Sequence, residues 1–261
     1  MVTINNPDFD IHQIARSGQC FRMSKLGVNS YKVIAFGHSV VVEQTNDDII
    51  FYCHKNEFDD VWYDYFDLGC DYGNVKQQVL RYNDDFLTKA VEYGYGIRIL
   101  KQNLWEAMIS FIISQRNSIP RIVKSIDKLC GGMTYFPSPQ DIVIMSDAQL
   151  QECGLGYRVK YVKNLAKSVI SGDCDLKKLQ HASYDNAINM LLSIYGVGDK
   201  VANCVALYGL HHLEAFPVDT WMKRIINIHY GGHLDVKRFG KYAGIVQQYM
   251  FFYKRSLSKT E

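Results

Sequence analysis

The chain has 261 residues, 48% of them hydrophobic and 13% aromatic, which suits one large or two small domains and excludes extensive disorder. Its 29 basic and 27 acidic residues leave a net charge of only +2, so any nucleic-acid-binding face must be a local patch. The 7 cysteines include no CxxC pair, which argues against a zinc site or iron–sulfur cluster and favours a reducing, intracellular compartment. With neither a signal-peptide pattern nor an apolar run of about 18 residues, we expect no membrane contact.

Strand signals dominate the first 80 residues. Runs rich in Val and Ile predict antiparallel strands at 31–44 and 47–54, and a flanking helix is expected at 61–68. Further along, helical periodicity predicts helices at 84–94, 104–115, 119–132, 146–156, 161–172, 184–196, 220–228 and 239–257. We therefore predict an α+β protein, with an N-terminal antiparallel sheet domain over 1–80 and a larger all-helical domain over 81–261.

The segment LLSIYGVGDKVANCVALYGL, residues 191–210, interrupts an apolar run with two glycines. Gly196, Val197 and Gly198 predict a tight turn inside a helix-hairpin-helix over about 186–210, because glycine permits positive φ and close backbone approach. The turn amides and the start of the next helix form an anion site suited to a DNA phosphate. An ordinary helical hairpin is the alternative from this pattern alone.

Lys200 follows this turn at a helix start, where desolvation and the helix dipole both disfavour the charged form of its amine. A neutral amine is a nucleophile that can form a Schiff base with a sugar carbon; the alternative is a snorkelling surface lysine. Asp219, two residues after Pro217, predicts a helix N-cap. An anchored carboxylate of this kind can also stabilise positive charge that develops on a sugar ring.

The order GVGDKVANC followed by PVD resembles the helix-hairpin-helix DNA glycosylases, and Lys200 matches their bifunctional members. Three further stretches, SGQCFR (17–22), GLGYRVKYV (154–162) and YAGIVQQYMF (242–251), are similar to the 8-oxoguanine DNA glycosylase branch. The resemblance implies a base-excision-repair enzyme that removes 8-oxoguanine from duplex DNA, preferably opposite cytosine, and then acts as an AP lyase. It implies that Lys200 attacks C1′ and that Asp219 supports the developing oxocarbenium ion and helps to activate the lysine.

The same resemblance implies a pocket for the base, and the last helix supplies part of that pocket. Gly18 matches a glycine whose carbonyl accepts the N7–H of 8-oxoguanine, and Gln247 matches a reader of the Watson–Crick edge. Phe251 and Cys204 cover the two faces of the base, and Pro217 completes the pocket. Without the resemblance, Gly18 would be interpreted as a loop glycine, Gln247 as a surface residue and Phe251 as a core residue.

Other residues are implied in contacts with the duplex. Tyr157 and Arg158 match a wedge and an arginine that contacts the estranged cytosine, and Arg121 matches a second cytosine reader. The alternative interpretation of Tyr157 and Arg158 is a solvated helix start. When the base leaves the helix, the gap in the base stack is filled either by Arg116, which has the matching position in the motif, or by Asn117, which has the matching residue type. The backbone contacts are implied for Gly196, Val197, Gly198, Val201 and Trp221, where Trp221 replaces a histidine that is usual in eukaryotic members.

Further expectations follow from the resemblance. It implies no redox cofactor, no iron–sulfur cluster and no catalytic metal, although a monovalent or divalent cation could bind at the hairpin. The short N-terminal domain suggests a compact prokaryotic member. We also expect a monomer that works in the cytoplasm or nucleoid. Two other functions stay open: a monofunctional alkylated-base glycosylase, which lacks the lysine, and a non-catalytic helix-hairpin-helix module, which needs neither Lys200 nor Asp219.

Overall fold

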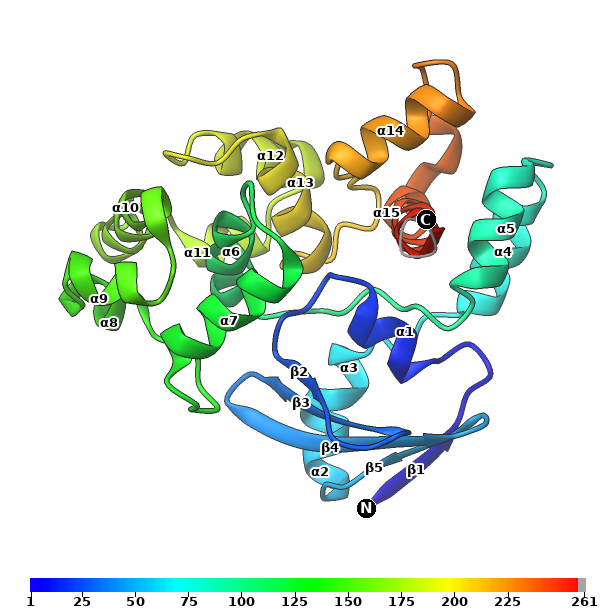
Figure 1. Ribbon diagram of the computed structural model, residues 1–261, viewed down its shortest axis with the longest axis horizontal. Coiled ribbons are helices and arrows are strands. Elements are labelled where there is room, and N and C mark those ends of the chain that lie inside the picture. The colour runs from blue at the N-terminus through cyan, green and yellow to red at the C-terminus, as the bar shows by residue number, and fades with distance from the viewer. Residues whose placement is uncertain (258–261) are drawn as a thin grey trace.

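A computed structural model describes residues 1–257 and shows a five-stranded antiparallel sheet followed by a larger helical region (Figure 1). The predicted α+β class is confirmed. The sheet has the order β1-β5-β4-β3-β2, and every neighbouring pair is antiparallel. Its strands are β1 (Val2–Asn5), β2 (Met23–Lys25), β3 (Ser30–Ala35), β4 (His38–Thr45) and β5 (Asp48–Phe51).

The predicted strand at 31–44 is a hairpin of two strands. Ala35 pairs with His38, and the two residues between them, Phe36 and Gly37, have φ of +52° and +81°. Such a two-residue turn matches the right-handed twist of the flanking strands. β1 and β2 were not predicted, because strands of four and three residues carry too short a pattern and are defined by pairing with β5 and β3.

Short helices cover one face of the sheet. They are α1 (Ile11–Arg16), α2 (Lys55–Glu57), the π-helical turn η1 (Phe58–Trp62) and α3 (Tyr63–Tyr65). Ile14, Trp62 and Phe66 are buried there with Val33 and other inward-facing strand residues. The helix predicted at 61–68 thus starts earlier, and it ends earlier because Asp67 adopts a positive φ of +51°.

The helical region contains the predicted helices and three that were missed: α4, which is as long as α5, and the shorter α8 and α11. Its elements are α4 (Tyr72–Leu80), α5 (Asp85–Tyr93), α6 (Leu104–Ile113), α7 (Ile119–Cys130), α8 (Pro139–Ile144), α9 (Asp147–Glu152), η2 (Gly156–Arg158), α10 (Val159–Ser171), α11 (Leu176–Gln180), α12 (Tyr184–Leu192), α13 (Asp199–Tyr208), α14 (Thr220–His229), η3 (Val236–Tyr242) and α15 (Ala243–Leu257). The longest expected helix, 239–257, is divided at Gly240, whose backbone is non-helical.

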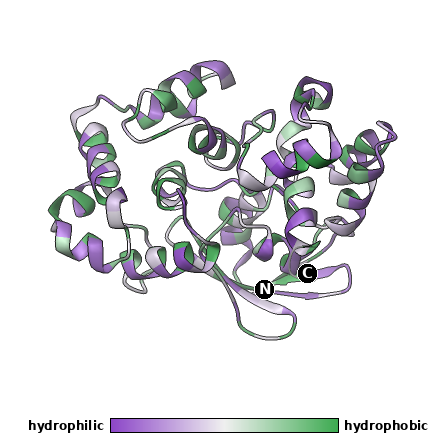
Figure 2. Ribbon diagram, turned by 45° about the horizontal axis from the view of Figure 1, so that its top comes forward, coloured by the Kyte–Doolittle hydropathy of each residue, from purple (hydrophilic) through white to green (hydrophobic). Residues whose placement is uncertain are grey.

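Two hydrophobic cores correspond to the two parts of the chain. The sheet core takes its buried residues from 9–66 together with Leu100, and the helical core takes them from 72–252 together with Phe21. Many helices carry apolar and polar residues on opposite sides (Figure 2), as expected where one side is buried. Within the described chain, no helix combines the length and apolar character that a bilayer span requires.

The segment between α1 and β2 connects the cores. Phe21 lies in the helical core, where its ring meets Phe111 of α6 edge-on with centroids 5.9 Å apart. Arg22, the next residue, donates to the carbonyl oxygen of Thr134 at 3.0 Å and pairs with the buried Glu106 at 3.4 Å. These contacts hold Phe21 and Arg22 against α6, and Gln248 of α15 donates to the carbonyl of Ser17 at 2.9 Å. Residues 17–22 therefore lie between these two helices.

Candidate active site

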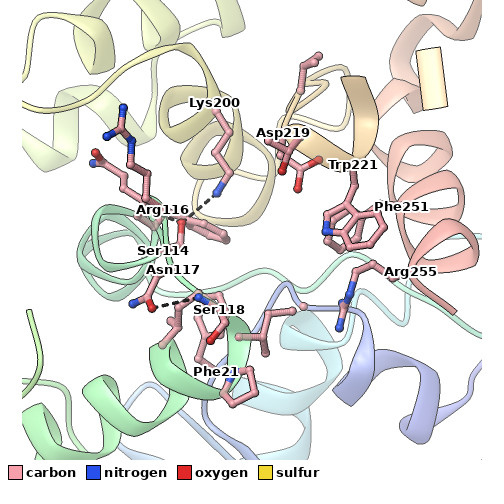
Figure 3. Close-up of a pocket in the computed structure, with 18 of the residues that line it drawn as sticks. Phe21, Ser114, Arg116, Asn117, Ser118, Lys200, Asp219, Trp221, Phe251 and Arg255 are labelled. Atoms are coloured by element: carbon pink, nitrogen blue, oxygen red, sulfur yellow. Dashed lines mark hydrogen bonds between the residues drawn. The ribbon is translucent and has the colours of Figure 1, made fainter. Parts of the chain in front are cut away.

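Lys200 and Asp219 line the same cavity of about 510 Å³, and each lies near the start of a helix (Figure 3). Lys200 is the second residue of α13, and Asp219 is the N-cap of α14. The Asp219 carboxylate accepts a hydrogen bond from the Met222 amide at 2.9 Å, which confirms the predicted cap. The cap fixes the carboxylate at the cavity wall, facing the same space as the amine.

The amine of Lys200 donates to the hydroxyl of Ser114 at 2.9 Å and lies 5.5 Å from the centre of the Phe111 ring. Among the residues of the described chain, no carboxylate lies within ion-pair distance of this amine. Lys200 therefore points into the cavity and not along the surface (Figure 3), unlike a snorkelling lysine.

The two glycines of the hairpin turn between α12 and α13 differ in backbone conformation and in the space around them. Gly196 has φ of +87°, and a Cβ at this position would lie 2.3 Å from the Tyr161 ring. Gly198 has an extended backbone, with φ of −111°, and nothing lies within 4 Å of the place a Cβ would take. A positive φ is therefore required at Gly196 only, and α12 ends at Leu192, earlier than predicted.

All five residues predicted to bind the base line one small cavity of about 50 Å³, which adjoins the larger one at Lys200 and Asp219. They are Gly18, Cys204, Pro217, Gln247 and Phe251. They come from four separate parts of the chain, so only the tertiary fold brings them together. Burial raises the pKa of the Cys204 thiol, which keeps it a neutral apolar wall.

Gln247 is buried, with 4% of its surface exposed, and its side-chain oxygen has no hydrogen-bond partner within the described residues. Its neighbour Gln248 is also buried, but its amide accepts from the Tyr208 hydroxyl and donates to the Ser17 carbonyl at 2.9 Å. An unpaired buried acceptor costs about 1–3 kcal/mol. Gln247 is thus the polar group left available for a donor that enters this cavity.

The predicted wedge residues surround the loop after α6. Arg116 is exposed at the mouth of the large cavity with φ of +47°, whereas the Asn117 amide is bonded to the Ile113 carbonyl at 3.1 Å. Tyr157 is 48% exposed. Arg121 is exposed on the first turn of α7 and lies outside the lining of this cavity.

Arg158 differs from a solvated helix start, because only 7% of its surface is exposed. Its guanidinium donates to the carbonyl oxygen of Gln115 at 2.9 Å and to that of Arg116 at 3.2 Å. It also lies 4.6 Å from the centre of the Tyr157 ring. In this structure, Arg158 therefore holds the loop after α6 and does not face the cavity.

The hairpin lies beside a further cavity of about 490 Å³, whose lining combines Asp199 with several basic side chains. Gly198, Val201, Lys200, Arg116 and Lys223 line it. The side chain of Val201 is buried, so the contact available at this position is the backbone. Trp221 lies on the large cavity, and the Arg224 guanidinium is 5.4 Å from the centre of its ring. These positive groups suit the backbone of a nucleic acid.

Sequence reasoning missed four residues of the site: Phe111, Ser114, Gln115 and Arg255. Phe111 and Ser114 contact Lys200, and Gln115 donates to the Gly196 carbonyl at 2.8 Å. The Arg255 guanidinium lies 5.2 Å from the centre of the Phe251 ring. The only available signal was their position beside the motif residues, since Ser114 and Gln115 directly precede Arg116. Within residues 1–257, no group of three His, Cys, Asp or Glu could hold a metal ion.

Comparisons with known proteins agree with this geometry. Residues 1–108 match the N-terminal domain of 8-oxoguanine DNA glycosylase, and residues 109–238 match the HhH-GPD superfamily of base excision DNA repair proteins. A "Probable N-glycosylase/DNA lyase" of Methanothermobacter thermautotrophicus is 31% identical over 212 residues, which cover 66% of this chain and 68% of that protein.

Two solved structures have nearly the same fold. MBOgg1, bound to a low-affinity DNA ligand, has a TM-score of 0.92 and 35% identity, covering 98% of this chain and 96% of that one. The Clostridium acetobutylicum 8-oxoguanine glycosylase/lyase, bound to double-stranded DNA with cytosine opposite 8-oxoG, has a TM-score of 0.90 and 32% identity, covering 97% and 93%.

The hairpin, the capped aspartate and the lysine between them thus define a base-excision-repair glycosylase of the HhH-GPD superfamily. Within that superfamily, the chain belongs to the 8-oxoguanine DNA glycosylase family and is an enzyme of the N-glycosylase/DNA lyase type.

Proposed function

We propose that this enzyme excises 8-oxoguanine from duplex DNA, preferably opposite cytosine, with Lys200 as a covalent nucleophile. The observation that carries the proposal is the shared cavity: an amine with no carboxylate partner in the described chain faces a capped carboxylate, beside a small cavity with an unsatisfied amide oxygen. A monofunctional glycosylase or a binding module has no need of that amine.

The chemistry follows from these groups. The lone pair of the Lys200 amine forms a bond to C1′, and the bond from C1′ to the base breaks with its electrons on the base, which takes up a proton. Asp219 stabilises the positive charge on the sugar during this step, and its cap to Met222 keeps it in place. A proton then moves from the attached nitrogen to O4′, the bond from C1′ to O4′ breaks with its electrons on O4′, which becomes a hydroxyl, and the nitrogen lone pair forms the double bond of an iminium ion. Loss of a C2′ proton then expels the 3′ phosphate, and hydrolysis releases the lysine.

Base recognition would use the small cavity. The free Gln247 oxygen accepts an N–H of the base, and Phe251 stacks on one face while the neutral Cys204 thiol covers the other. A carbonyl at Gly18 would accept the N7–H of 8-oxoguanine. Guanine has no hydrogen at N7 and would leave that acceptor unpaired, which costs about 1–3 kcal/mol.

The remaining contacts belong to the duplex. Arg116 is the better candidate to fill the vacated stack, because the Asn117 amide is already bonded within its loop. Tyr157 would act as the wedge, and Arg121 and Arg158 would contact the estranged cytosine. For Arg158 this requires DNA to draw the guanidinium out of its bonds with Gln115 and Arg116.

Gly196, Val197, Gly198, Val201 and Trp221 would contact the DNA backbone. No redox cofactor or iron–sulfur cluster enters the proposal. A monovalent or divalent cation at the hairpin stays a prediction. The Gly196 and Gly198 carbonyls each accept one protein hydrogen bond and retain a lone pair that could coordinate a cation and offset phosphate charge. We further propose a monomer that acts on the nucleoid inside a prokaryotic cell.

The test is covalent trapping. Wild-type protein and duplex DNA with one 8-oxoguanine opposite cytosine are incubated with borohydride, which reduces an imine to a stable adduct. We expect an adduct with wild type and none with Lys200→Gln. The matched control is Lys223→Gln, which removes another lysine of the same large cavity and should still trap at saturating DNA. Base release without any wild-type adduct would instead indicate a monofunctional enzyme, and binding without base release a binding module.

A further inference from the structure

Ser114 accepts a hydrogen bond from the Lys200 amine. It is the C-cap of α6, and the Lys200 amine donates to its hydroxyl oxygen at 2.9 Å. The two residues are 86 positions apart, so the contact exists only because α13 packs against α6. Ser114 also lines the large cavity with Lys200 and Asp219.

The direction of this hydrogen bond is fixed by a second one. The Ser114 hydroxyl donates its only hydrogen to the Phe111 carbonyl at 2.7 Å. Towards Lys200 the oxygen can therefore act only as an acceptor. A serine whose hydrogen was free could instead donate to the lone pair of a neutral amine, and that lone pair could not then attack carbon.

The Phe111 ring limits the amine on another side, with its centre 5.5 Å from the nitrogen. The amine is thus held by one N–H at the oxygen of Ser114 and by contact with the ring, and the Cys204 thiol, one turn further along α13, also interacts with it. The remaining directions face the cavity that it shares with Asp219 (Figure 3). Holding a reactive group in a near-attack position removes part of the entropic cost of the reaction.

We propose that Ser114 is a positioning residue for the nucleophile: its acceptor-only hydroxyl fixes the Lys200 amine and leaves the nitrogen lone pair free to attack C1′. This inference rests on the proposed role of Lys200. It assigns to α6 a part in the chemical step, separate from the DNA contacts of the loop that follows it.

The test compares Ser114→Ala, which removes the acceptor, with Ser114→Thr, which keeps a hydroxyl able to bond the same carbonyl. We expect Ser114→Ala to lower the single-turnover rate of base release by about tenfold, which corresponds to about 1.4 kcal/mol of barrier. Borohydride trapping on DNA that already contains an abasic site should slow equally, because it uses the same amine. The Kd for lesion DNA should stay within about twofold, and Ser114→Thr should restore both rates.

Ser193→Ala serves to calibrate stability. Ser193 is the C-cap of α12 and donates to the Met190 carbonyl at 2.7 Å, so its removal deletes the same local bond at an exposed site. Equal losses of Tm in the two alanine variants, with slow trapping only in Ser114→Ala, support the proposal. Unchanged rates in Ser114→Ala, or a loss that appears in Kd alone, overturn it and leave the Lys200 mechanism intact. Absence of a wild-type adduct overturns both.

Discussion

The side-chain amide of Gln115 donates a hydrogen bond to the carbonyl oxygen of Gly196 at 2.8 Å, across 81 positions of sequence. It connects the loop after α6, which carries Arg116, to the hairpin turn. The backbone carbonyl of Gln115 in turn accepts from Arg158. One residue therefore couples three segments that the family resemblance assigns to DNA contact.

Removing this connection should weaken DNA binding more than chemistry. In Gln115→Ala the hairpin turn and the loop lose their shared bond, and we expect Kd to rise about three- to tenfold for both lesion and undamaged duplex, equivalent to about 0.5–1.5 kcal/mol. Fluorescence anisotropy measures both affinities. Gln77→Ala, which removes an exposed glutamine of α4, should bind like wild type. A loss restricted to lesion DNA would contradict this role.

The two hairpin glycines should respond differently to alanine. Gly196→Ala places a methyl group 2.3 Å from the Tyr161 ring at a positive φ, so we expect the free energy of unfolding to fall by more than about 2 kcal/mol. Gly198→Ala meets no atom within 4 Å and should fold normally. It should nevertheless weaken DNA binding, because the methyl group keeps a phosphate away from the turn amides. Thermal unfolding and anisotropy together distinguish the two effects.

Gln247 and Gln248 form a second matched pair. Gln248→Ala breaks the bonds to Tyr208 and Ser17 and should destabilise the fold by about 2–3 kcal/mol. Gln247→Ala removes an unsatisfied buried oxygen and should leave stability within about 1 kcal/mol of wild type, while binding of 8-oxoguanine DNA falls at least tenfold. If Gln247→Ala reduces affinity for undamaged duplex by the same factor, the residue does not read the base.

Stability should depend on pH through Glu106. Burial raises the pKa of this carboxyl to about 7, against the opposing effect of Arg22. Because the folded state binds the proton more tightly than the unfolded one, the contribution is present below about pH 4.5 and is lost as the pH rises to 7. The difference in unfolding free energy between wild type and Glu106→Gln should therefore change by about 3 kcal/mol over this window. Denaturant titrations at pH 5 and 8 measure it, and a parallel dependence in both proteins would exclude Glu106.

The sequence predicted the parts of the fold that have long patterns. Helical periods found α6, α7, α10 and α13, and the Val-rich runs found β3 to β5. Short elements such as β1 and α11 were missed, because their limits depend on pairing and caps and not on periodicity. In the sequence, the only sign of the turn at Phe36 and Gly37 is the glycine that interrupts the run rich in Val and Ile.

For the site, the motif residues were predictable and their partners were not. Lys200, Asp219, Gln247 and Phe251 matched local motifs, and the structure brings them together. Ser114 could not be found this way, since its role depends on the packing of α6 against α13. The burial of Arg158 also depends on a distant loop, and a charged residue after a glycine turn gives no local sign of it.

Residues 16–18 are held from the far end of the chain: Gln248 donates to the Ser17 carbonyl and Arg255 donates to the Arg16 carbonyl. Gly18 lines both cavities together with Lys200, so the last helix sets the position of a wall that faces the amine. Phe21, three residues after Gly18, packs against Phe111, whose ring contacts the same amine. The 17–22 segment thus links the C-terminal helix to the surroundings of Lys200.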